Sequence, residues 1–393
     1  MAIVKLAEVC EKIGSGATPR GGKEAYCDEG ISLVRSQNVL DFNFSKEGLA
    51  FINDEQAKKL SNVEVHSGDV LLNITGDSVA RACLMDDDYL PARVNQHVAI
   101  IRGNSHKIMN GYVLYYLQWR KEYLLQLASA GATRNALTKA MIEQLELDLP
   151  PLDSQQQIVA ILDSLQSKIQ LNQKTNDNLY EIVNAYYTSL FKDVECEMTT
   201  IGNYAERIYS GGTPTTSNAA YWDGTFGWFS SGETRNRFVI STEKSITQTG
   251  IDNSSTKLAA KHDIVMASAG QGFTRGQTSM LLIDTYVNQS VIVIHADRKI
   301  LPYLFWNLAN RYEELRTISD SSSIRGSLTT KMIAAFEVPL ANNDVIQTFS
   351  DFAWAVIPQI ENNLLENERL AALRDLLLPK LMSGEIDVSA VQL

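Results

Sequence analysis

Two loops of this 393-residue chain combine small hydroxyl residues with glycines, a pattern that can bind phosphate groups. The first is Ser15-Gly16-Ala17-Thr18-Pro19-Arg20, with Lys23 just beyond it, and the second is Ser210-Gly211-Gly212-Thr213-Pro214-Thr215. Backbone N–H groups of such loops can approach a nucleic-acid backbone closely, and hydroxyl or cationic side chains can then hold a phosphate. The alternative is an ordinary turn rich in glycine and proline. The candidate contacts in these loops are Ser15, Thr18, Arg20, Lys23, Ser210, Thr213 and Thr215.

Other polar segments occupy equivalent places in the two halves of the chain. Gly76–Arg81 and Gly270–Gly276 each combine glycine with an arginine, which can make a bidentate contact with guanine or phosphate. Arg35–Asn38 and Glu233–Arg237 contain arginine and amide side chains, which suit guanine and adenine. Solvated surface loops are the alternative. The candidate contacts are Arg35, Gln37, Asn38, Asp77, Arg81, Thr234, Arg235, Arg237, Gln271, Thr274 and Arg275, with Arg134 and Arg325 from two repeated Arg-x-x-Leu-Thr segments.

Motifs for catalysis do not occur in the sequence. The first loop is not a nucleotide-binding phosphate loop, because its glycine spacing differs and Glu24 follows Lys23 where Ser or Thr would bind magnesium. The Asn- or Asp-Pro-Pro-Tyr/Phe motif of amino methyl transfer is absent, and the five histidines show no metal-binding spacing. We therefore expect no catalytic residue, no metal site and no cofactor in this chain.

The loops recur because the chain is a tandem duplication of one unit. Besides the first loop, Val94-Asn95-Gln96 recurs as Val287-Asn288-Gln289, and Arg134–Thr138 recurs as Arg325–Thr329. The offset drifts only from 195 to 191 residues, so each copy is about half of the chain. A duplicated unit of this size indicates two similar binding domains with two similar targets.

Each copy ends in a segment with the spacing of a coiled coil. Apolar residues separated by alternating fours and threes run through residues 158–190 and 349–381, and asparagines fill the same two seam positions in both copies. Exposed helix positions are the alternative for these asparagines. Antiparallel helices would bring them together in two polar layers that specify register and orientation, Asn172 with Asn367 and Asn176 with Asn363.

The secondary structure of each copy is predicted to be mixed, with β-rich runs followed by an amphipathic helix at residues 112–127 and 302–317. Prolines then mark the boundary before each coiled-coil segment. The sequence predicts an α+β fold in which two similar mixed α/β domains are joined by two long helices that form an antiparallel coiled coil, with a pseudo-two-fold internal repeat. The expected segments are residues 1–150 and 198–341 for the domains, 151–197 for the central helix and 342–393 for the C-terminal helix.

The composition is typical of a globular protein, with 45% hydrophobic and 21% charged residues. No signal peptide, no apolar run that could span a membrane and no paired cysteine motif is found, so we expect a cytoplasmic protein without membrane association. The two helical segments carry −9 of the net charge of −11. Acidic helices can dock a basic partner, and near-neutral domains can still bind nucleic acid if their cations gather on one face.

These features together resemble the DNA-specificity subunit of a type I restriction-modification system. The resemblance rests on two units that each open near an Ile-x-Ser-Gly-x-Thr-Pro loop, contain Val-Asn-Gln before a β-run, close at a Pro-Leu boundary and continue into a long helix. It covers essentially the whole chain. It implies that residues 1–150 and 198–341 are target-recognition domains, each of which reads one half of a bipartite site on double-stranded DNA.

The resemblance also implies partners for the chain. The paired helices would act as a spacer and dock two methyltransferase (modification) subunits, and restriction subunits would join them to form the nuclease of a defence system. The chain itself would be non-catalytic, while the complex would act as an adenine-specific DNA methyltransferase and endonuclease. S-adenosylmethionine, magnesium and ATP are then expected only in the partner subunits. Two other classes stay open: a non-catalytic protein-binding scaffold with two adaptor domains on a coiled coil, and a single-chain methyltransferase or nuclease, which the missing motifs disfavour.

Overall fold

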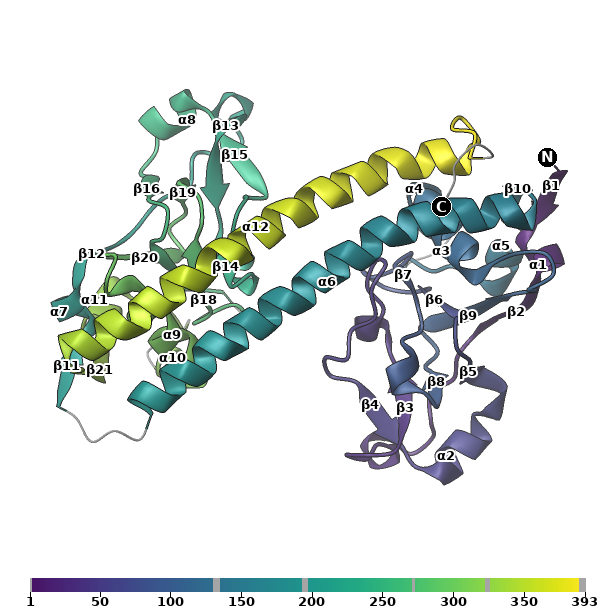
Figure 1. The fold of residues 1–393 in the computed structure, drawn as a ribbon, viewed down its shortest axis with the longest axis horizontal. Helices are drawn as coiled ribbons and strands as arrows, with labels where there is room; N and C mark the ends of the chain where they lie inside the picture. The colour runs from purple at the N-terminus through teal and green to yellow at the C-terminus, as the bar shows by residue number, and fades with distance from the viewer. Residues whose placement is uncertain (1, 130–134, 193–196, 271–272, 322–325, 389–393) are drawn as a thin grey trace. The chain divides into compact units, whose positions relative to one another are not determined.

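The structure of the protein is a computed structural model, shown in Figure 1. It describes residues 2–129, 135–192, 197–270, 273–321 and 326–388. The chain forms two compact units: unit 1 is Met1–Ile169 with Arg369–Leu393, and unit 2 is Gln170–Glu368. Each unit includes part of the two long helices described below. The four segments predicted from the sequence instead separate the helices from the domains, and their boundaries stay a prediction.

The described part of unit 1 is built on two four-stranded sheets. One has the order β2-β9-β6-β7 and is antiparallel, with strands β2 (Cys10–Ser15), β9 (Val98–Gly103), β6 (Val70–Asn73) and β7 (Ala82–Leu84). The other has the order β4-β3-β8-β5, with strands β4 (Ala50–Ile52), β3 (Ile31–Val34), β8 (Ala92–Val94) and β5 (Glu64–Val65). Within it, β3 and β8 run parallel. A short ladder joins β1 (Ala2–Lys5) to β10 (Glu146–Leu149).

Unit 2 repeats this strand order. One sheet is β12-β20-β17-β18-β14, with strands β12 (Ala205–Ser210), β20 (Val291–Ala296), β17 (Ile264–Ala267), β18 (Thr278–Leu281) and β14 (Phe238–Val239). The other is β15-β13-β19-β16, with strands β15 (Lys244–Ile246), β13 (Trp222–Phe229), β19 (Thr285–Val287) and β16 (Lys257–Ala259). Here β13 and β19 are the parallel pair, and β11 (Met198–Thr200) joins β21 (Glu337–Pro339). The duplication in the sequence is therefore a duplication of the fold.

The central strands of each unit are buried on both faces, which explains their unbroken apolar sequences. In unit 1, Leu72 and Ile101 point into the core beneath the helices, whereas Leu71 and Ile100 point into the core shared with the second sheet. Neighbouring residues of a strand alternate between faces, so each run fills two cores at once.

Short helices complete the two units in the same order. Unit 1 has α1 (Leu6–Val9), α2 (Asp54–Lys59), α3 (Asn110–Trp119), α4 (Lys121–Ser129) and α5 (Lys139–Glu143). Unit 2 has α7 (Ile201–Tyr204), α8 (Gln248–Asp252), α9 (Leu301–Asn310), α10 (Tyr312–Ser321) and α11 (Thr330–Ala334).

The prediction of one amphipathic helix over residues 112–127, and of another over 302–317, was wrong in two respects. Each is a pair of helices. The first helix ends at Arg120 between α3 and α4, and at Arg311 between α9 and α10. The first helix of each pair is also buried almost all round rather than amphipathic. It lies between a sheet and a long helix, as the hydrogen bond of 2.6 Å from Tyr115 to Asp163 shows for α3.

Two helices of 40 residues, α6 (Leu152–Phe191) and α12 (Asn343–Met382), run side by side and antiparallel within each unit (Figure 1). In unit 1, the side chain of Arg374 donates to Gln166 at 2.6 Å. In unit 2, the antiparallel direction follows from two asparagine pairs. This is the antiparallel coiled coil that the sequence predicts. None of the helices in the described ranges is long and apolar enough to cross a membrane.

The asparagine layers have the pairing expected for antiparallel helices. The Asn172 side-chain amide donates to the Asn367 side-chain oxygen at 2.8 Å, and that of Asn363 donates to Asn176 at 2.7 Å. Asn172 also donates to Glu366 at 2.7 Å. Because amides buried between helices are costly when unpaired, these bonds penalise any shift in register.

The buried stripe of α6 differs from the predicted seam in its second half. The sequence placed Leu179, Tyr186 and Leu190 in the seam, but the most buried residues are one position later, at Tyr180, Tyr187 and Phe191. These rings pack on α9 as well as on α12. Tyr180 stacks on Trp306 of α9 at 5.7 Å, and the Tyr187 ring lies 6.2 Å from that of Tyr303 on α9 and 5.5 Å from that of Phe349 on α12. The helix therefore turns part of its apolar face toward the domain that it completes.

Candidate nucleic-acid interface

In unit 1, the loop after β2 docks on the turn that follows β8. The Gly16 N–H donates to the carbonyl of Val98 at 2.9 Å, and the Ala17 N–H donates to the carbonyl of Val94 at 3.0 Å. A Cβ atom on Gly16 would overlap the Val94 carbonyl oxygen. Only glycine allows this approach, which ties one sheet to the other.

In unit 2, the equivalent loop after β12 makes the same approach to the turn after β19. The Gly211 N–H donates to the carbonyl of Asn288 at 3.2 Å, and the Gly212 N–H donates to that of Val287 at 3.1 Å. A Cβ atom on Gly211 would overlap the Val287 carbonyl oxygen. The first glycine of the repeated motif is thus required for the same structural reason in both copies.

A hydroxyl–amide pair then joins the two repeated motifs. Thr18 donates its hydroxyl to the side-chain oxygen of Gln96, and Thr213 does the same to Gln289. Both glutamines are exposed. These glutamines were not among the contacts predicted from the sequence, although their recurrence in Val-Asn-Gln was a signal that could have identified them.

Other loops lie beside this contact. In unit 1, the His97 carbonyl accepts from the Ile74 N–H at 3.0 Å, and the Ser36 carbonyl accepts from the Asn73 side-chain amide at 2.8 Å. In unit 2, the Ser290 carbonyl accepts from the Ser268 N–H at 2.8 Å.

These contacts, together with the parallel pairing that brings the ends of β3 and β13 beside β8 and β19, gather four loops at one end of the sheets in each unit, and we call each group the loop cluster. In unit 1 the loop cluster consists of Ser15–Arg20, Arg35–Asn38, Ile74–Arg81 and Asn95–His97. In unit 2 it consists of Ser210–Thr215, Ser231–Arg237, Ser268–Gly276 without residues 271 and 272, and Asn288–Ser290. The structure thereby brings together most of the residues that the sequence proposed.

Several of the proposed residues lie open on the loop clusters. In unit 1, Arg20 is exposed and Arg81 is half-buried, and neither guanidinium has a hydrogen bond or ion pair within the described ranges. Cations in this state can take up a phosphate or a base edge without first losing a partner. The remaining accessible candidates are Ser15, Thr18, Asp77 and Thr215, which are exposed, and Ser210, Thr213 and Thr274, which are half-buried.

The polar residues of Arg35–Asn38 mainly hold their own turn. Asn38 is fully buried, and its amide donates to the carbonyls of Ser45 at 2.9 Å and Glu47 at 3.1 Å. Gln37 and Arg35 both donate to the carbonyl of Gly48. The predicted contact of Asn38 with adenine would require its buried hydrogen bonds to break, so the structure gives this residue a structural place instead.

The equivalent segment of unit 2 is partly engaged in the same way. Thr234 is buried and donates to the carbonyl of Ser231 at 2.8 Å, which takes it out of reach of a ligand. Arg235 is exposed but pairs with Glu243. Arg237 is also exposed, lies 4.2 Å from the centre of the Tyr180 ring and stands 3.8 Å from Asp177.

The two loop arginines predicted to be equivalent are in opposite states. Arg275 is only 6% exposed, ion-pairs with Asp320 and donates to the carbonyl of Gly326 at 2.9 Å. A guanidinium with these partners braces its loop and is not free for a bidentate contact, so the prediction that Arg275 binds nucleic acid is corrected to a structural role. Arg81 remains the accessible arginine of this pair.

Some predicted residues cannot be placed in this way. Arg134, Gln271 and Arg325 lie outside the described residues, and so does the side chain of Lys23 in the short helix Gly22–Ala25. The repeated segments that begin with Arg134 and Arg325 continue into described residues. There, the N–H groups of Leu137 and Leu328 donate to Ile74 and Ser268, both at 2.8 Å, which anchors each segment beside its loop cluster.

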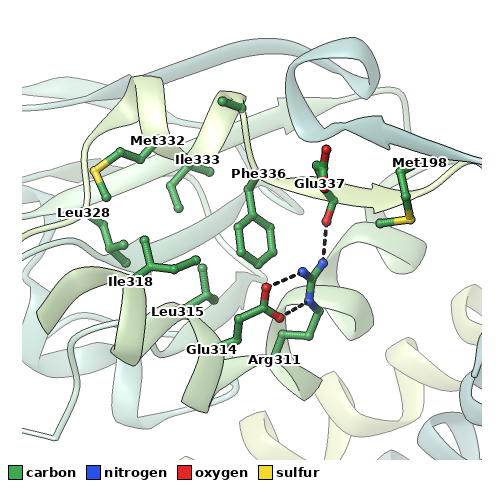
Figure 2. Close-up of a pocket in the computed structure, with 11 residues that line it drawn as sticks. Met198, Arg311, Glu314, Leu315, Ile318, Leu328, Met332, Ile333, Phe336 and Glu337 are labelled. Atoms are coloured by element: carbon green, nitrogen blue, oxygen red, sulfur yellow. Dashed lines mark hydrogen bonds and ion pairs between the residues drawn. The ribbon is translucent and has the colours of Figure 1, made fainter. Parts of the chain in front are cut away.

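A pocket of about 440 Å³ in unit 2 is lined by none of the loop-cluster residues (Figure 2). It lies between α10, α11 and β21, and its walls include Leu315 and Phe336. Arg311 at its edge is already held by Glu314, with two bonds of 2.7 Å, and donates to the Glu337 carbonyl. Figure 2 therefore shows a cation that is neutralised by its neighbours. Across the described ranges, no group of three His, Cys, Asp or Glu residues could hold a metal ion.

Comparison with known proteins identifies the class. The family model described as "Type I restriction modification DNA specificity domain" matches residues 1–181 and 194–367. The chain therefore belongs to the type I restriction-modification specificity family and carries two copies of its domain.

Individual relatives agree with this assignment. The chain is 20% identical to the "Type I restriction enzyme HindI specificity subunit" of Haemophilus influenzae, over 91% of this chain and 94% of that one. It is 24% identical to the "Type I restriction enzyme EcoR124I/EcoR124II specificity subunit" of Escherichia coli, over 61% of each. A solved specificity (S) subunit from M. genitalium has the same fold, with a TM-score of 0.59, 13% identity and coverage of 97% and 96% of the two chains.

The glycine approach generates the first testable prediction. Gly16→Ala and Gly211→Ala should each destabilise their own unit by about 1–3 kcal/mol, because the added methyl group collides with a backbone carbonyl that cannot move independently. Urea unfolding followed by hydrogen exchange of peptides from each unit would measure this. Gly14→Ala is the matched control, since a Cβ atom there meets nothing within 4 Å. Equal stability of all three variants would show that the close approach is unimportant.

Proposed function

We propose that this chain is the non-catalytic subunit that gives a type I restriction-modification complex its DNA sequence specificity. The loop cluster of unit 1 binds one half of a bipartite site on double-stranded DNA, and the loop cluster of unit 2 binds the other half. The observation that supports this proposal is that the two loop clusters share one backbone arrangement but present different side chains. Gly16 and Gly211 make the same contact in the two units, whereas the accessible Arg81 of unit 1 has Gln277 as its structural counterpart in unit 2.

Joining two such units gives the chain its affinity. Few base contacts fit on one loop cluster, and phosphate contacts carry no sequence information. Two weak readers on one chain bind cooperatively, because the first contact raises the effective concentration of the second. A helix of 40 residues spans about 60 Å at 1.5 Å per residue, so α6 paired with α12 is a spacer long enough to separate two half-sites.

The long helices also suit protein partners. They leave large apolar side chains in solvent, namely Leu171 at 58%, Ile182 at 54%, Leu373 at 43% and Leu376 at 58% exposure. Ile182 and Leu373 are equivalent in the internal repeat, at the offset of 191 residues. Two equivalent apolar positions on acidic helices favour docking of two copies of one partner.

We assign those partners as two methyltransferase subunits, with restriction subunits completing a cytoplasmic complex. The complex would then methylate adenine and cut DNA, and S-adenosylmethionine, magnesium and ATP would be held by the partner subunits. A protein-binding scaffold with two adaptor domains is the rival function. It differs in one measurable respect, since a scaffold would select no DNA sequence.

Exchange of one unit tests the proposal. Replacing residues 170–368 by the matching segment of a relative with another target should change one half of the methylated site and leave the other half unchanged. This segment keeps both asparagine layers and the α6 residues that pack on α9, which an exchange of residues 198–341 alone would separate from their partners. Methylated adenines would be mapped in a genome that carries the hybrid and the methyltransferase.

Changes in both halves of that site would refute independent reading by the two units. The unaltered chain is the control in the same host. If it produced methylation or binding without sequence preference, the scaffold would be the better description.

The two loop arginines provide a matched pair of variants. Arg81→Ala should weaken DNA binding by about 1–3 kcal/mol, because an accessible guanidinium that makes a bidentate base contact is lost. Arg275→Ala should instead lower the stability of unit 2, because Asp320 and the Gly326 carbonyl lose their partner. Fluorescence anisotropy with duplex DNA and thermal unfolding would separate the two effects. Unchanged DNA binding by Arg81→Ala would remove this side chain from the interface.

Shortening the helix pair tests its role as a spacer. Deleting Leu165–Leu171 together with Glu368–Arg374 removes one heptad from facing parts of α6 and α12 and keeps all four layer asparagines. The pair shortens by about 10 Å, or about three base pairs. From a pool of duplexes with both half-sites and variable gaps, the variant should select a gap shorter by that amount.

The deletion also removes the contact between Gln166 and Arg374. The full-length double variant Gln166→Ala with Arg374→Ala loses that contact without shortening, and it should keep the original gap. Selection of the original gap by the shortened chain at full affinity would mean that the helices do not set the separation.

A further inference from the structure

Phe273 stands out on the loop cluster of unit 2. It is 86% exposed, more than any other large apolar side chain in the described ranges. It follows β17 in the loop Ser268–Gly276, which is tied to the turn that contains Gln289 by the bond from the Ser268 N–H to the Ser290 carbonyl. An isolated exposed phenylalanine at a predicted binding surface indicates a contact with something outside the chain.

The backbone around Phe273 is held in place. Its carbonyl accepts a hydrogen bond of 2.6 Å from the Tyr312 hydroxyl on α10. Two residues later, Arg275 is tied to Asp320 and to the Gly326 carbonyl. These bonds brace the loop at Phe273 and on its C-terminal side, so the phenyl ring is displayed from an anchored position.

The equivalent loop of unit 1 displays different chemistry. Its last hydrogen bond, from the Ala80 N–H to the Asn73 carbonyl, matches the bond from Gly276 to Ala267 in unit 2 and sets an offset of 196 residues. Phe273 then corresponds to Asp77, which is also exposed, and the buried Arg275 corresponds to Val79, which is only 4% exposed. Unit 1 thus presents a carboxylate at this place, whereas unit 2 presents an aromatic ring.

We infer that Phe273 is a specificity-determining residue that makes an apolar contact with a base in the half-site of unit 2. This inference rests on the proposed function. Because the backbone arrangement is common to both units, Phe273 and Asp77 occupy corresponding places against the duplex. A carboxylate at that place can accept from the amino group of cytosine, but an aromatic ring can gain only from the apolar surfaces of DNA. Those surfaces are the 5-methyl group of thymine in the major groove and the faces of the bases.

The test uses the full chain assembled with its methyltransferase partner and a duplex carrying the mapped site. Phe273→Ala should weaken binding to that site by about tenfold and leave binding to unrelated duplex DNA and the salt dependence of binding unchanged. Phe273→Tyr, which keeps the ring, should restore most of the affinity. Leu340→Ala is the matched control, because Leu340 is 46% exposed outside the loop cluster. It should bind like the unaltered protein.

Modified duplexes distinguish the two apolar surfaces. Replacing each thymine of the second half-site by uracil removes only the methyl group, and one such position should weaken the unaltered protein but not Phe273→Ala if the methyl group is the contact. If no uracil position does so, 2-aminopurine next to the contact should report unstacking with the unaltered protein alone. Either result supports the inference.

The inference is overturned if Phe273→Ala keeps full affinity and the same base preference at every position of the second half-site. It is also overturned if that variant loses thermal stability in step with binding, because the ring would then be structural. Both results leave the proposed function intact when the unaltered protein still selects its site. Absence of sequence selection by the unaltered protein would instead refute the proposed function itself.

Discussion

Each unit depends on the close backbone contact between its first loop and the turn after a strand of the other sheet. The loop follows β2 or β12, and its glycine, Gly16 or Gly211, lies against a carbonyl that leaves no room for a side chain. This contact ties the two sheets together at one end. The exposed loops are held next to it by backbone and side-chain hydrogen bonds, so their positions are set by the frame more than by their own sequences. A binding surface built on such a frame is organised before a ligand arrives, which lowers the entropy lost on binding.

The residues that recur in both copies are therefore poor candidates for telling two half-sites apart. Gly16 approaches a valine carbonyl as its counterpart does in unit 2, and Thr18 pairs with Gln96 as Thr213 pairs with Gln289, so these residues cannot give the two units different preferences. Discrimination has to come from positions where the copies differ on the common frame. Arg81 and Phe273 are such positions. A change of side chain there alters the contact with DNA at little cost to the fold, because neither side chain holds its loop in place.

Sequence periodicity was sufficient for the architecture but not for the site. The duplication and the antiparallel helices could be predicted because heptad spacing and paired asparagines are local signals that survive without knowledge of the fold. The state of Asn38, Thr234 and Arg275 could not be predicted. Amide, hydroxyl and guanidinium groups bind carbonyl oxygens of their own chain as readily as bases, and the partner can be remote. Arg275 and the Gly326 carbonyl are 51 residues apart in the sequence.

The spacer helices are part of the core of both units, and this links spacing to folding. Leu378 and Leu381 of α12 lie in the core of unit 1, while Phe349 and Ile360 of the same helix lie in the core of unit 2. A slip of α12 along α6 would withdraw apolar residues from both cores and leave the layer asparagines without their partners. Each loss alone costs free energy, and together they make a wrong register far less stable than the observed one. Buried asparagines stabilise a coiled coil less than leucine would, but they exclude alternatives that leucine would tolerate. The contacts that fix the register of the helix pair are thus the same contacts that fold the two units.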